Sequence, residues 1–235
     1  MHQQSIPTIT DFMSSTIQQV YVSLEMEKLK ACCPLTQQSN KILKRTFDIL
    51  FSVMVMLFLL SWLLPLLALY IKLTSGGEVF FKQQRTGLHN HTFTVWKLRT
   101  MRPNSEAHVL QAKQNDTRIT KAGKFLRKYS LDELPQFFNV LVGDMSIVGP
   151  RPHMLKHTEE YAAKHQLYNL RHTVKPGITG LSQVLGYRGE IQCPFSLRNR
   201  ITLDIFYIKK WSLGLDIYII AKTVKLLLIG DKNAY

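Results

Sequence analysis

The sequence predicts an α+β fold that is mostly helical: a re-entrant membrane helix, a small domain that contains a β-hairpin, and amphipathic helices at the membrane interface. Three features support this class. A long run without charged residues lies in the N-terminal third. Two strand-like stretches flank a glycine turn after it, and most of the remaining chain has helical periodicity.

The charge balance indicates an anionic partner. The 235 residues carry a net charge of +14, which suits nucleic acid, anionic lipid or a phosphorylated substrate. Cys32, Cys33 and Cys193 lack metal-ligand spacing, so we expect reduced thiols. The pair His89 and His91 has no third ligand nearby, so no metal site is expected there.

Residues 1–40 form a polar N-terminal segment rich in Gln, Ser and Thr. Asp11 is a candidate N-cap for a helix that runs to about Lys30, and Pro34 follows its end. We expect this segment to be partly helical and to have a structural or interaction role without chemistry of its own.

Residues 41–75 form the predicted membrane unit, because no charged residue occurs from Ile49 to Ile71. At about 1.5 Å per residue, a straight helix over this run is roughly 34 Å long, enough to cross a core of about 30 Å. Pro65 interrupts the run and favours a kink. Basic residues flank the run on both sides, whereas a spanning helix carries its positive excess on one side. These features favour a helix that breaks at Pro65 and returns to the same face, with a spanning helix as the alternative.

Residues 76–235 form the predicted globular domain. Val79–Lys82 and Thr92–Leu98 are predicted strands, joined as a hairpin through a turn at Gly87. The basic residues of this unit are explained equally well by a solvated face and by a ligand site.

The domain is otherwise predicted to be helical. Its last two helices are amphipathic, and Trp211 with its neighbouring lysines suits the headgroup boundary. We expect both at the membrane interface, with packing on the domain's own core as the alternative for the last one. The predicted helices lie around Ser105–Lys113, over Thr120–Tyr129, within His153–His172, and over Arg200–Trp211 and Leu213–Ile229.

The stretch from Arg127 to Pro152 carries the candidate chemistry. Adjacent Asp132 and Glu133 lie between Arg127 and Arg151, an arrangement suited to phosphate chemistry with a metal ion. Near a helix N-terminus an ionised Asp132 is a candidate nucleophile toward a bound phosphate. Adjacent helical residues diverge by about 100°, so one carboxylate can attack while the other holds a metal.

The same residues also have a purely structural interpretation. Ser130 to Glu133 matches the S-x-x-E capping box, in which Ser130 is the N-cap and Glu133 bonds back to the backbone. Pro135 would then lie in the second turn and cost a hydrogen bond, which a helix starting at Pro135 avoids. Both registers stay open at this stage.

Arg151 lies between Pro150 and Pro152, which fix the backbone on both sides of it. A guanidinium presented rigidly in this way suits bidentate phosphate binding. Taken alone, however, a P-R-P sequence is better explained by a stiff surface loop.

An ordered set of motifs now gives a family resemblance. KRTFDIL precedes the apolar run, and VFFKQQRTG, FTVWKLRTM, DTRITKAGKFLRKYSLDELPQFFNVLVGDMSIVGPRP, VKPGITGLSQVLGYRGE and LDIFYIKKWSLGLDIYIIAKT follow. Each motif alone is weak, but the ordered set from Lys41 to Thr223 is specific. It resembles the bacterial sugar transferase family, the monotopic polyprenyl-phosphate phosphoglycosyl transferases of the undecaprenyl-phosphate hexose-1-phosphate transferase type.

The resemblance implies an activity and its residues. The protein would transfer a sugar-1-phosphate from a UDP-sugar to polyprenyl (undecaprenyl) phosphate and release UMP, as the first membrane step of exopolysaccharide, capsule, O-antigen or glycoconjugate assembly. Asp132 would attack the β-phosphate and carry a covalent phosphosugar, and Glu133 would help to hold Mg²⁺. Arg127, Arg151 and Arg188 would bind phosphates. The resemblance also implies a re-entrant helix.

The resemblance further implies a place and partners. We expect the bacterial inner membrane, with the catalytic domain, residues 76–235, on the cytoplasmic face. The expected partners are a UDP-sugar, polyprenyl phosphate and membrane lipid but no nucleic acid, and homo-oligomerisation is left open. The alternative is a membrane-anchored basic module that binds anionic lipid or nucleic acid without catalysis, which would leave the acidic pair idle. The sequence does not specify the sugar, although the loop Gly186–Glu190 resembles that of hexose-1-phosphate members.

Overall fold

A computed structural model of the chain describes residues 9–75, 77–103, 112, 116–189, 191 and 193–229, with side chains described from residue 17 onward. This part is mostly helical and contains two small two-stranded sheets, so the predicted α+β, mostly helical class is confirmed. The helix predicted around residues 105–113 lies outside the described residues.

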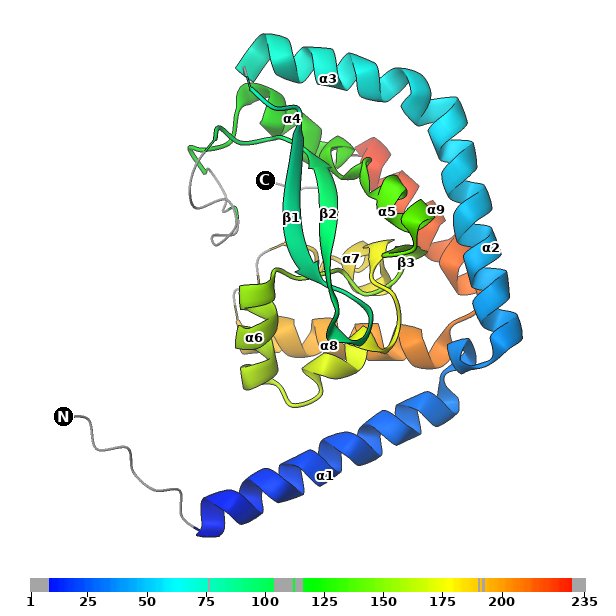
Figure 1. The fold of residues 1–235 in the computed structure, drawn as a ribbon, viewed down its shortest axis with the longest axis vertical. Coiled ribbons are helices and arrows are strands. Elements are labelled where there is room, and N and C mark those ends of the chain that lie inside the picture. The colour runs from blue at the N-terminus through cyan, green and yellow to red at the C-terminus, as the bar shows by residue number, and fades with distance from the viewer. Residues whose placement is uncertain are drawn as a thin grey trace, which may run out of the picture.

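A long bent helix forms one outer edge of the molecule (Figure 1). It consists of α2 (Gln38–Val55), a π-helical turn (Met56–Leu60) and α3 (Ser61–Ser75), which follow one another directly. Pro65 lies inside α3. A proline has no N–H to donate and crowds the preceding turn, and a π-helical turn also deflects a helix. The bend therefore has two local causes.

Side chains satisfy backbone carbonyls within this bend. Ser61 Oγ donates to the Leu57 carbonyl at 2.7 Å, and Trp62 Nε1 donates to the Phe58 carbonyl at 2.8 Å. An unpaired polar group is costly in an apolar environment, and these bonds pair the Ser61 hydroxyl and the Trp62 N–H within the helix. Among the described residues, the bent helix is the one that is long and apolar enough to cross a membrane.

A β-hairpin lies at the centre of the molecule, between α3 and α8 in Figure 1. β1 (Phe80–Thr86) pairs antiparallel with β2 (Thr92–Leu98), so the predicted hairpin is confirmed. β2 has the predicted bounds, whereas β1 runs further toward Gly87 than predicted. Thr86 pairs with Thr92 directly beside the turn, and this cross-strand pairing extends β1 through polar residues.

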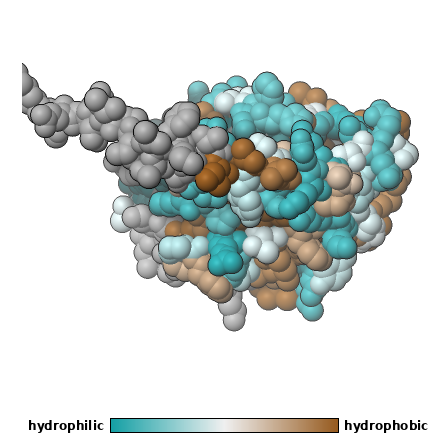
Figure 2. All heavy atoms as spheres, turned by 90° about the horizontal axis from the view of Figure 1, so that it is seen from below, coloured by the Kyte–Doolittle hydropathy of each residue, from teal (hydrophilic) through white to brown (hydrophobic). Residues whose placement is uncertain are grey.

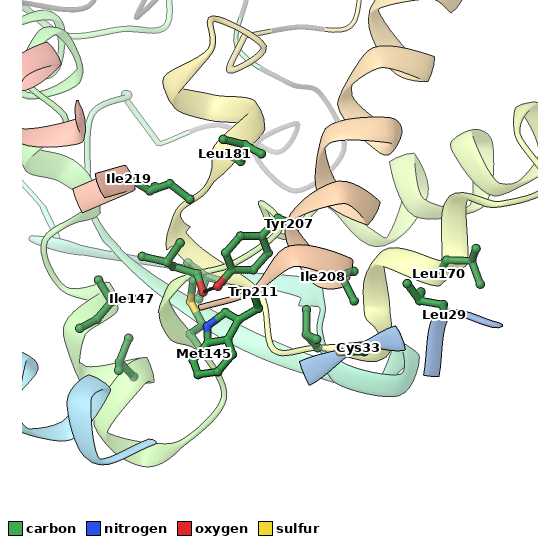
Figure 3. Packing of buried hydrophobic residues seen from close by; sticks show 14 residues of the cluster. Leu29, Cys33, Met145, Ile147, Leu170, Leu181, Tyr207, Ile208, Trp211 and Ile219 are labelled. Atoms are coloured by element: carbon green, nitrogen blue, oxygen red, sulfur yellow. Dashed lines mark hydrogen bonds between the residues drawn. The ribbon is translucent and has the colours of Figure 1, made fainter. Parts of the chain in front are cut away.

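The main core surrounds a short parallel pair of strands, β3 (Ser146–Val148) and β4 (Gly177–Thr179). Figure 3 shows buried side chains from both ends of the chain packing together there. The prediction of one helical stretch in residues 153–172 gives way to α6 and a separate 3-10 helix, Tyr168–Thr173. The remaining helices are α1 (Ile9–Cys32), α4 (Lys121–Lys128), α5 (Gln136–Val142), α6 (Leu155–Lys164), α7 (Leu181–Val184), α8 (Pro194–Lys210) and α9 (Leu213–Ile229).

Buried polar contacts attach α2 to this core. Lys44 Nζ donates to Asp216 Oδ2 of α9 at 2.7 Å, with both side chains buried. One turn later, Asp48 Oδ1 accepts from Ser146 Oγ and the Ile147 N–H, both at 3.1 Å. The first arm of the bent helix is therefore tied to β3 and α9 by charged and polar groups as well as by apolar packing.

Trp211 lies in the core and not at a headgroup boundary, so that prediction is wrong. It is 5% exposed, and its Nε1 donates to Asp216 Oδ2 at 3.1 Å. The buried Asp216 carboxylate needs hydrogen-bond donors, and this need draws the indole inward. α9 is apolar on both sides: Ile219 is buried, whereas Ile217 and Leu228 are exposed.

The exposed apolar side chains are not spread evenly. Seen from the side of α1, the surface mixes hydrophilic and hydrophobic side chains (Figure 2). Along the bent helix, by contrast, many of the exposed side chains are large and apolar. They include Leu50, Leu57, Phe58, Trp62, Leu66, Leu69 and Leu73.

Replacing the buried carboxylate of α9 is expected to destabilise the fold. Asp216→Ala leaves the Lys44 ammonium without its counter-charge and removes an acceptor from Tyr207 and Trp211. Removing one partner of a buried ion pair costs about 3–5 kcal/mol. Equilibrium unfolding of the detergent-solubilised chain measures this loss.

The double variant Lys44→Met with Asp216→Leu serves as the matched control. It removes both charges together and is expected to recover part of the loss. An Asp216→Ala protein as stable as the wild type would contradict an anchoring role for this pair.

Candidate active site

A cavity of about 590 Å³ lies against one face of the β-hairpin. It reaches from the end of α3 to α6 and α8, and basic side chains dominate its polar lining. Asp132 and Glu133 lie within it, together with all three arginines predicted to bind phosphate, Arg127, Arg151 and Arg188. The structure thus brings the five predicted residues to one place.

The hairpin provides the floor of the cavity. Residues directly opposite one another in an antiparallel pair lie on the same face, and this face recurs every second residue. Lys97 pairs with Phe81, so Lys97 and Arg85 share a face and lie about 13 Å apart along the strands. Arg99 donates its N–H to the Val79 carbonyl and extends the same row by one more pair.

Glu133 is held by three cations. Its Oε1 accepts from Lys97 Nζ at 2.9 Å and from Arg151 Nη2 at 2.7 Å. Its Oε2 accepts from Arg188 Nη2 at 2.7 Å. Although burial disfavours its charge, Arg151, Lys97 and Arg188 hold the pKa of Glu133 well below its usual range. Glu133 is therefore a fixed anion that positions these three cations.

Asp132 has a different environment. It is also buried, but among the described residues no hydrogen bond or ion pair reaches its carboxylate. Burial raises the pKa of Asp132, with a further contribution from Glu133, against the opposing effect of Lys97. A carboxylate that lines the cavity, is poorly solvated and is not held by donors suits a nucleophile or a base.

The predicted capping box does not form. Ser130 has a left-handed backbone, φ 54° and ψ 24°, and makes no side-chain cap. Its Oγ instead accepts from Arg188 Nη1 at 2.7 Å, and the Glu133 side chain is occupied by cations. A three-residue 3-10 helix, Leu131–Glu133, carries the dyad, and α5 begins after Pro135, its N-cap. The first register is wrong, and the start at Pro135 is close.

Arg127 approaches the cavity from the last turn of α4. Thr120 caps this helix by accepting from the Gly123 N–H at 2.9 Å. A side chain at Gly123 would meet the Thr100 carbonyl at 1.9 Å, so glycine allows α4 to pack closely on the end of β2. Arg127 Nε then donates to Thr100 Oγ1 at 2.8 Å.

Arg151 is fixed from behind as well as by its prolines. Its carbonyl accepts from Arg171 Nη2 at 2.9 Å, and Arg171 is paired with Asp204 at 2.7 Å. Its guanidinium also donates to Gln183 Oε1 at 3.1 Å. The P-R-P segment is therefore part of the cavity wall and not a stiff surface loop.

Sequence reasoning missed several cavity residues. The basic character of the hairpin does not by itself single out Lys97, although its alternation with Arg99 along a strand indicates a shared face. Arg85 could have been placed on that face by the strand pairing. His153 and Arg200 had no such signal, because their placement depends on packing between α6, α8 and the segment after β3.

The residues present do not form a ready Mg²⁺ site at Glu133. Among the described residues, no group of three or more His, Cys, Asp or Glu side chains is arranged to hold a metal. Both Glu133 oxygens are engaged by cations, and a divalent ion there would face three positive charges. Ligation of Mg²⁺ by Glu133 stays a prediction.

Comparison with known proteins gives a consistent result. Residues 39–230 match the family described as bacterial sugar transferase. The chain is 50% identical over 186 residues to the UDP-glucose:undecaprenyl-phosphate glucose-1-phosphate transferase of Klebsiella pneumoniae, covering 79% of this chain and 40% of that protein. It is 43% identical over 214 residues to a protein of the same name from Caulobacter vibrioides, covering 91% and 79%.

A third relative carries a different sugar in its name. The chain is 44% identical over 190 residues to the UDP-N-acetylgalactosamine-undecaprenyl-phosphate N-acetylgalactosaminephosphotransferase of Aeromonas hydrophila, covering 80% of this chain and 44% of that protein. The chain thus spans less than half the length of the Klebsiella and Aeromonas relatives.

The two carboxylates are expected to affect stability with opposite signs. Glu133→Gln leaves Lys97, Arg151 and Arg188 without their anion and is expected to cost about 2–4 kcal/mol at pH 7. Asp132→Asn removes a buried charge whose pKa is raised, a penalty present above the ordinary Asp pKa of about 3.9, so stability should not fall. Equilibrium unfolding of both variants in the same detergent measures the two effects.

The pH dependence provides the control. Because the pKa of Glu133 is lowered in the fold, its stabilisation is present above the ordinary Glu pKa of about 4.3 and is lost as the pH falls through the folded value. The gap between wild type and Glu133→Gln should therefore narrow in acid. Equal losses of unfolding free energy in Glu133→Gln and Asp132→Asn would contradict the conclusion that the two carboxylates lie in different environments.

Proposed function

Because the chain belongs to the bacterial sugar transferase family, we propose that it transfers a sugar-1-phosphate from a UDP-sugar to undecaprenyl phosphate and releases UMP. One observation carries this proposal. The Asp132 carboxylate accepts no hydrogen bond from the described residues, while the adjacent Glu133 positions three cations around the same cavity. The names of the relatives support undecaprenyl phosphate as acceptor and a UDP-sugar as donor. Because those names differ in the sugar, they leave the transferred sugar open.

The first step uses Asp132 as the nucleophile. A carboxylate oxygen forms a bond to the β-phosphorus of the UDP-sugar, the bond from that phosphorus to the bridging oxygen breaks, and UMP leaves with the electron pair. Asp132 then carries the sugar phosphate. Because burial makes the carboxylate more basic than an exposed Asp, it is the better nucleophile once ionised.

The second step regenerates the carboxylate. A phosphate oxygen of undecaprenyl phosphate attacks the same phosphorus, and the bond to Asp132 breaks. The product is a lipid-linked sugar diphosphate. In both steps negative charge accumulates on phosphate oxygens, and fixed cations that need no reorganisation stabilise such charge. Lys97, Arg127, Arg151 and Arg188 supply these cations.

Mg²⁺ stays a prediction for this chain. When bound, the ion would supply charge compensation on substrate phosphate oxygens. The arrangement at Glu133 supports cation positioning and not metal ligation, so every step above relies on the chain's own residues. Homo-oligomerisation likewise stays open.

The bent helix supports a membrane role. We propose that residues 41–75 enter the bacterial inner membrane, turn near Pro65 and return to the cytoplasmic face, where residues 76–235 form the catalytic domain. The basis is the bend itself, the exposed apolar surface along both arms and the attachment of both ends to one domain. A non-catalytic lipid-binding module explains the helix but leaves the Asp132 environment without a use.

Loss of the nucleophile should abolish turnover. Asp132→Asn is expected to lower UMP release by at least roughly 10³-fold. The assay follows UMP with the purified membrane protein, a panel of UDP-sugars, undecaprenyl phosphate and Mg²⁺, with a parallel arm in EDTA. Glu159→Gln, an exposed carboxylate on α6, is the matched control and should retain activity. Full turnover by Asp132→Asn would sink the assignment.

The topology can be tested with cysteines. In a background where the exposed Cys32 and Cys193 are serine, Ser39→Cys and Thr74→Cys place thiols at the two ends of the bent helix. A membrane-impermeant maleimide should label both only from the cytoplasmic side, while Leu66→Cys near the bend should resist labelling. Labelling of positions 39 and 74 from opposite sides would rule out a re-entrant helix.

A further inference from the structure

The end of the cavity remote from α3 has more positive charge than its carboxylates balance. Arg171 is paired with Asp204, and Arg151 with Glu133. Arg85 and Arg200 line the same cavity, and within the described residues neither has a carboxylate at ion-pair distance. Arg200 donates to the Gly189 carbonyl at 2.9 Å, and Arg85 donates to the Pro152 carbonyl at 3.2 Å. Among the described residues, the hydrogen bonds of these two guanidiniums therefore go to neutral groups.

His153 lies between two of these arginines, and its two ring nitrogens cannot accept hydrogen bonds from both. Its Nδ1 lies 3.0 Å from Arg171 Nη1 and 2.6 Å from the Tyr168 hydroxyl, and its Nε2 lies 3.4 Å from Arg200 Nη1. A guanidinium only donates, and a neutral imidazole accepts at one nitrogen. If Nδ1 accepts from Arg171, then Nε2 carries the proton and meets a second donor.

In the opposite tautomer Nδ1 donates to the Tyr168 hydroxyl at 2.6 Å, and Arg171 Nη1 also donates to this hydroxyl, at 3.4 Å. This tautomer lets Nε2 accept from Arg200 Nη1, while Arg171 Nη1 lies 3.0 Å from a protonated nitrogen. The two contacts therefore cannot both be hydrogen bonds. In either tautomer, therefore, one guanidinium faces a protonated ring nitrogen of His153 at the cavity wall.

The electrostatics agree with this geometry. Burial lowers the pKa of His153 well below its usual range, with Arg171 and Arg200 adding to the effect, so a second proton does not bind. Burial and the neighbouring Arg171 lower the pKa of Arg200 to about 10, and burial with Arg151 lowers that of Arg85 to about 9. Burial is the first cause of each shift and neighbouring cations add to it, and a nearby anionic oxygen would oppose both effects.

The position of the Arg200 end of the cavity indicates which of the two substrates binds there. The row on the hairpin floor runs from Arg99, which donates to the Ser75 carbonyl at the end of α3, to Arg85 about 20 Å away. In Figure 1, α3 and α4 lie at one end of the hairpin, and α6 and α8 lie at the other. A lipid phosphate reaching in from the membrane helix meets the Arg99 end first, so the Arg200 end is left for the water-soluble donor.

We infer that Arg200, His153 and Arg85 form the subsite for the phosphate of the departing nucleoside monophosphate. This inference rests on the proposed function and assigns a place to its leaving group. When the bond between the β-phosphorus and the bridging oxygen breaks, the leaving phosphate gains a negative charge. Hydrogen-bond donors that are fixed next to the leaving phosphate stabilise this charge without reorganising. Their absence should slow the first step and leave the transfer to lipid unchanged.

Binding of the product tests the subsite without requiring turnover. Titration calorimetry on the full chain in nanodiscs compares UMP, uridine and farnesyl phosphate as probes. Arg200→Gln is expected to weaken UMP binding by about 10-fold or more and to change binding of uridine and farnesyl phosphate by less than about twofold. Arg198→Gln, an exposed position on the same helix, is the matched control and should leave all three affinities unchanged.

A second variant guards against misfolding. Arg85→Gln changes the same subsite from β1 and is expected to weaken UMP selectively as well. If farnesyl phosphate loses affinity and UMP does not, the subsite belongs to the lipid phosphate and the inference is overturned. Unchanged UMP binding in both folded variants, or no UMP binding by the wild type, overturns it too. Normal UMP binding without turnover on any UDP-sugar would sink the proposed function while retaining the subsite.

Discussion

One carboxylate holds the cavity together. Glu133 binds a lysine from β2, an arginine from the segment after β3 and another from the loop after α7. These segments are far apart in sequence and have no backbone pairing with one another at this point. Three cations around one anion leave two net positive charges at the cavity wall. That excess is unfavourable while it is partly buried, and it becomes favourable when a phosphate group enters.

The bent helix is attached at both ends to the domain that contains this cavity. The first arm reaches the core through Lys44 and Asp48, and Arg45 donates to the carbonyls at the C-terminal end of α5, the helix that follows the dyad. The second arm ends at Ser75, whose carbonyl and hydroxyl both accept from Arg99 at 3.1 Å. Because both arms are attached to the domain that contains Asp132, the position of the bend relative to the cavity is fixed.

Much of this was predictable from the sequence, and the failures have physical reasons. Strand β2 and helix α9 follow from local periodicity, which needs no knowledge of neighbours. The capping-box prediction was wrong because the S-x-x-E pattern considers only hydrogen bonds to the nearby backbone. In the fold, Arg188 and two further cations bind the same Ser130 and Glu133 atoms. The prediction for Trp211 was wrong because an indole near lysines suits a lipid headgroup as well as a buried carboxylate. The contact with Asp216 forms only when α8 and α9 pack together, and the sequence does not show this packing.

The difference between the two adjacent carboxylates has a backbone origin. Ser130 adopts a left-handed conformation, which costs a non-glycine residue on the order of 1 kcal/mol or more. The Arg188 contact to its hydroxyl helps to retain that conformation. The turn that follows is a 3-10 helix with about 120° between successive side chains, so Glu133 points into the cations while Asp132 does not. Arg188 donates to both the Ser130 hydroxyl and the Glu133 carboxylate. One side chain therefore stabilises both the left-handed residue and the carboxylate that follows it. The unequal pKa shifts of Asp132 and Glu133 therefore follow from the different directions in which this turn points the two side chains.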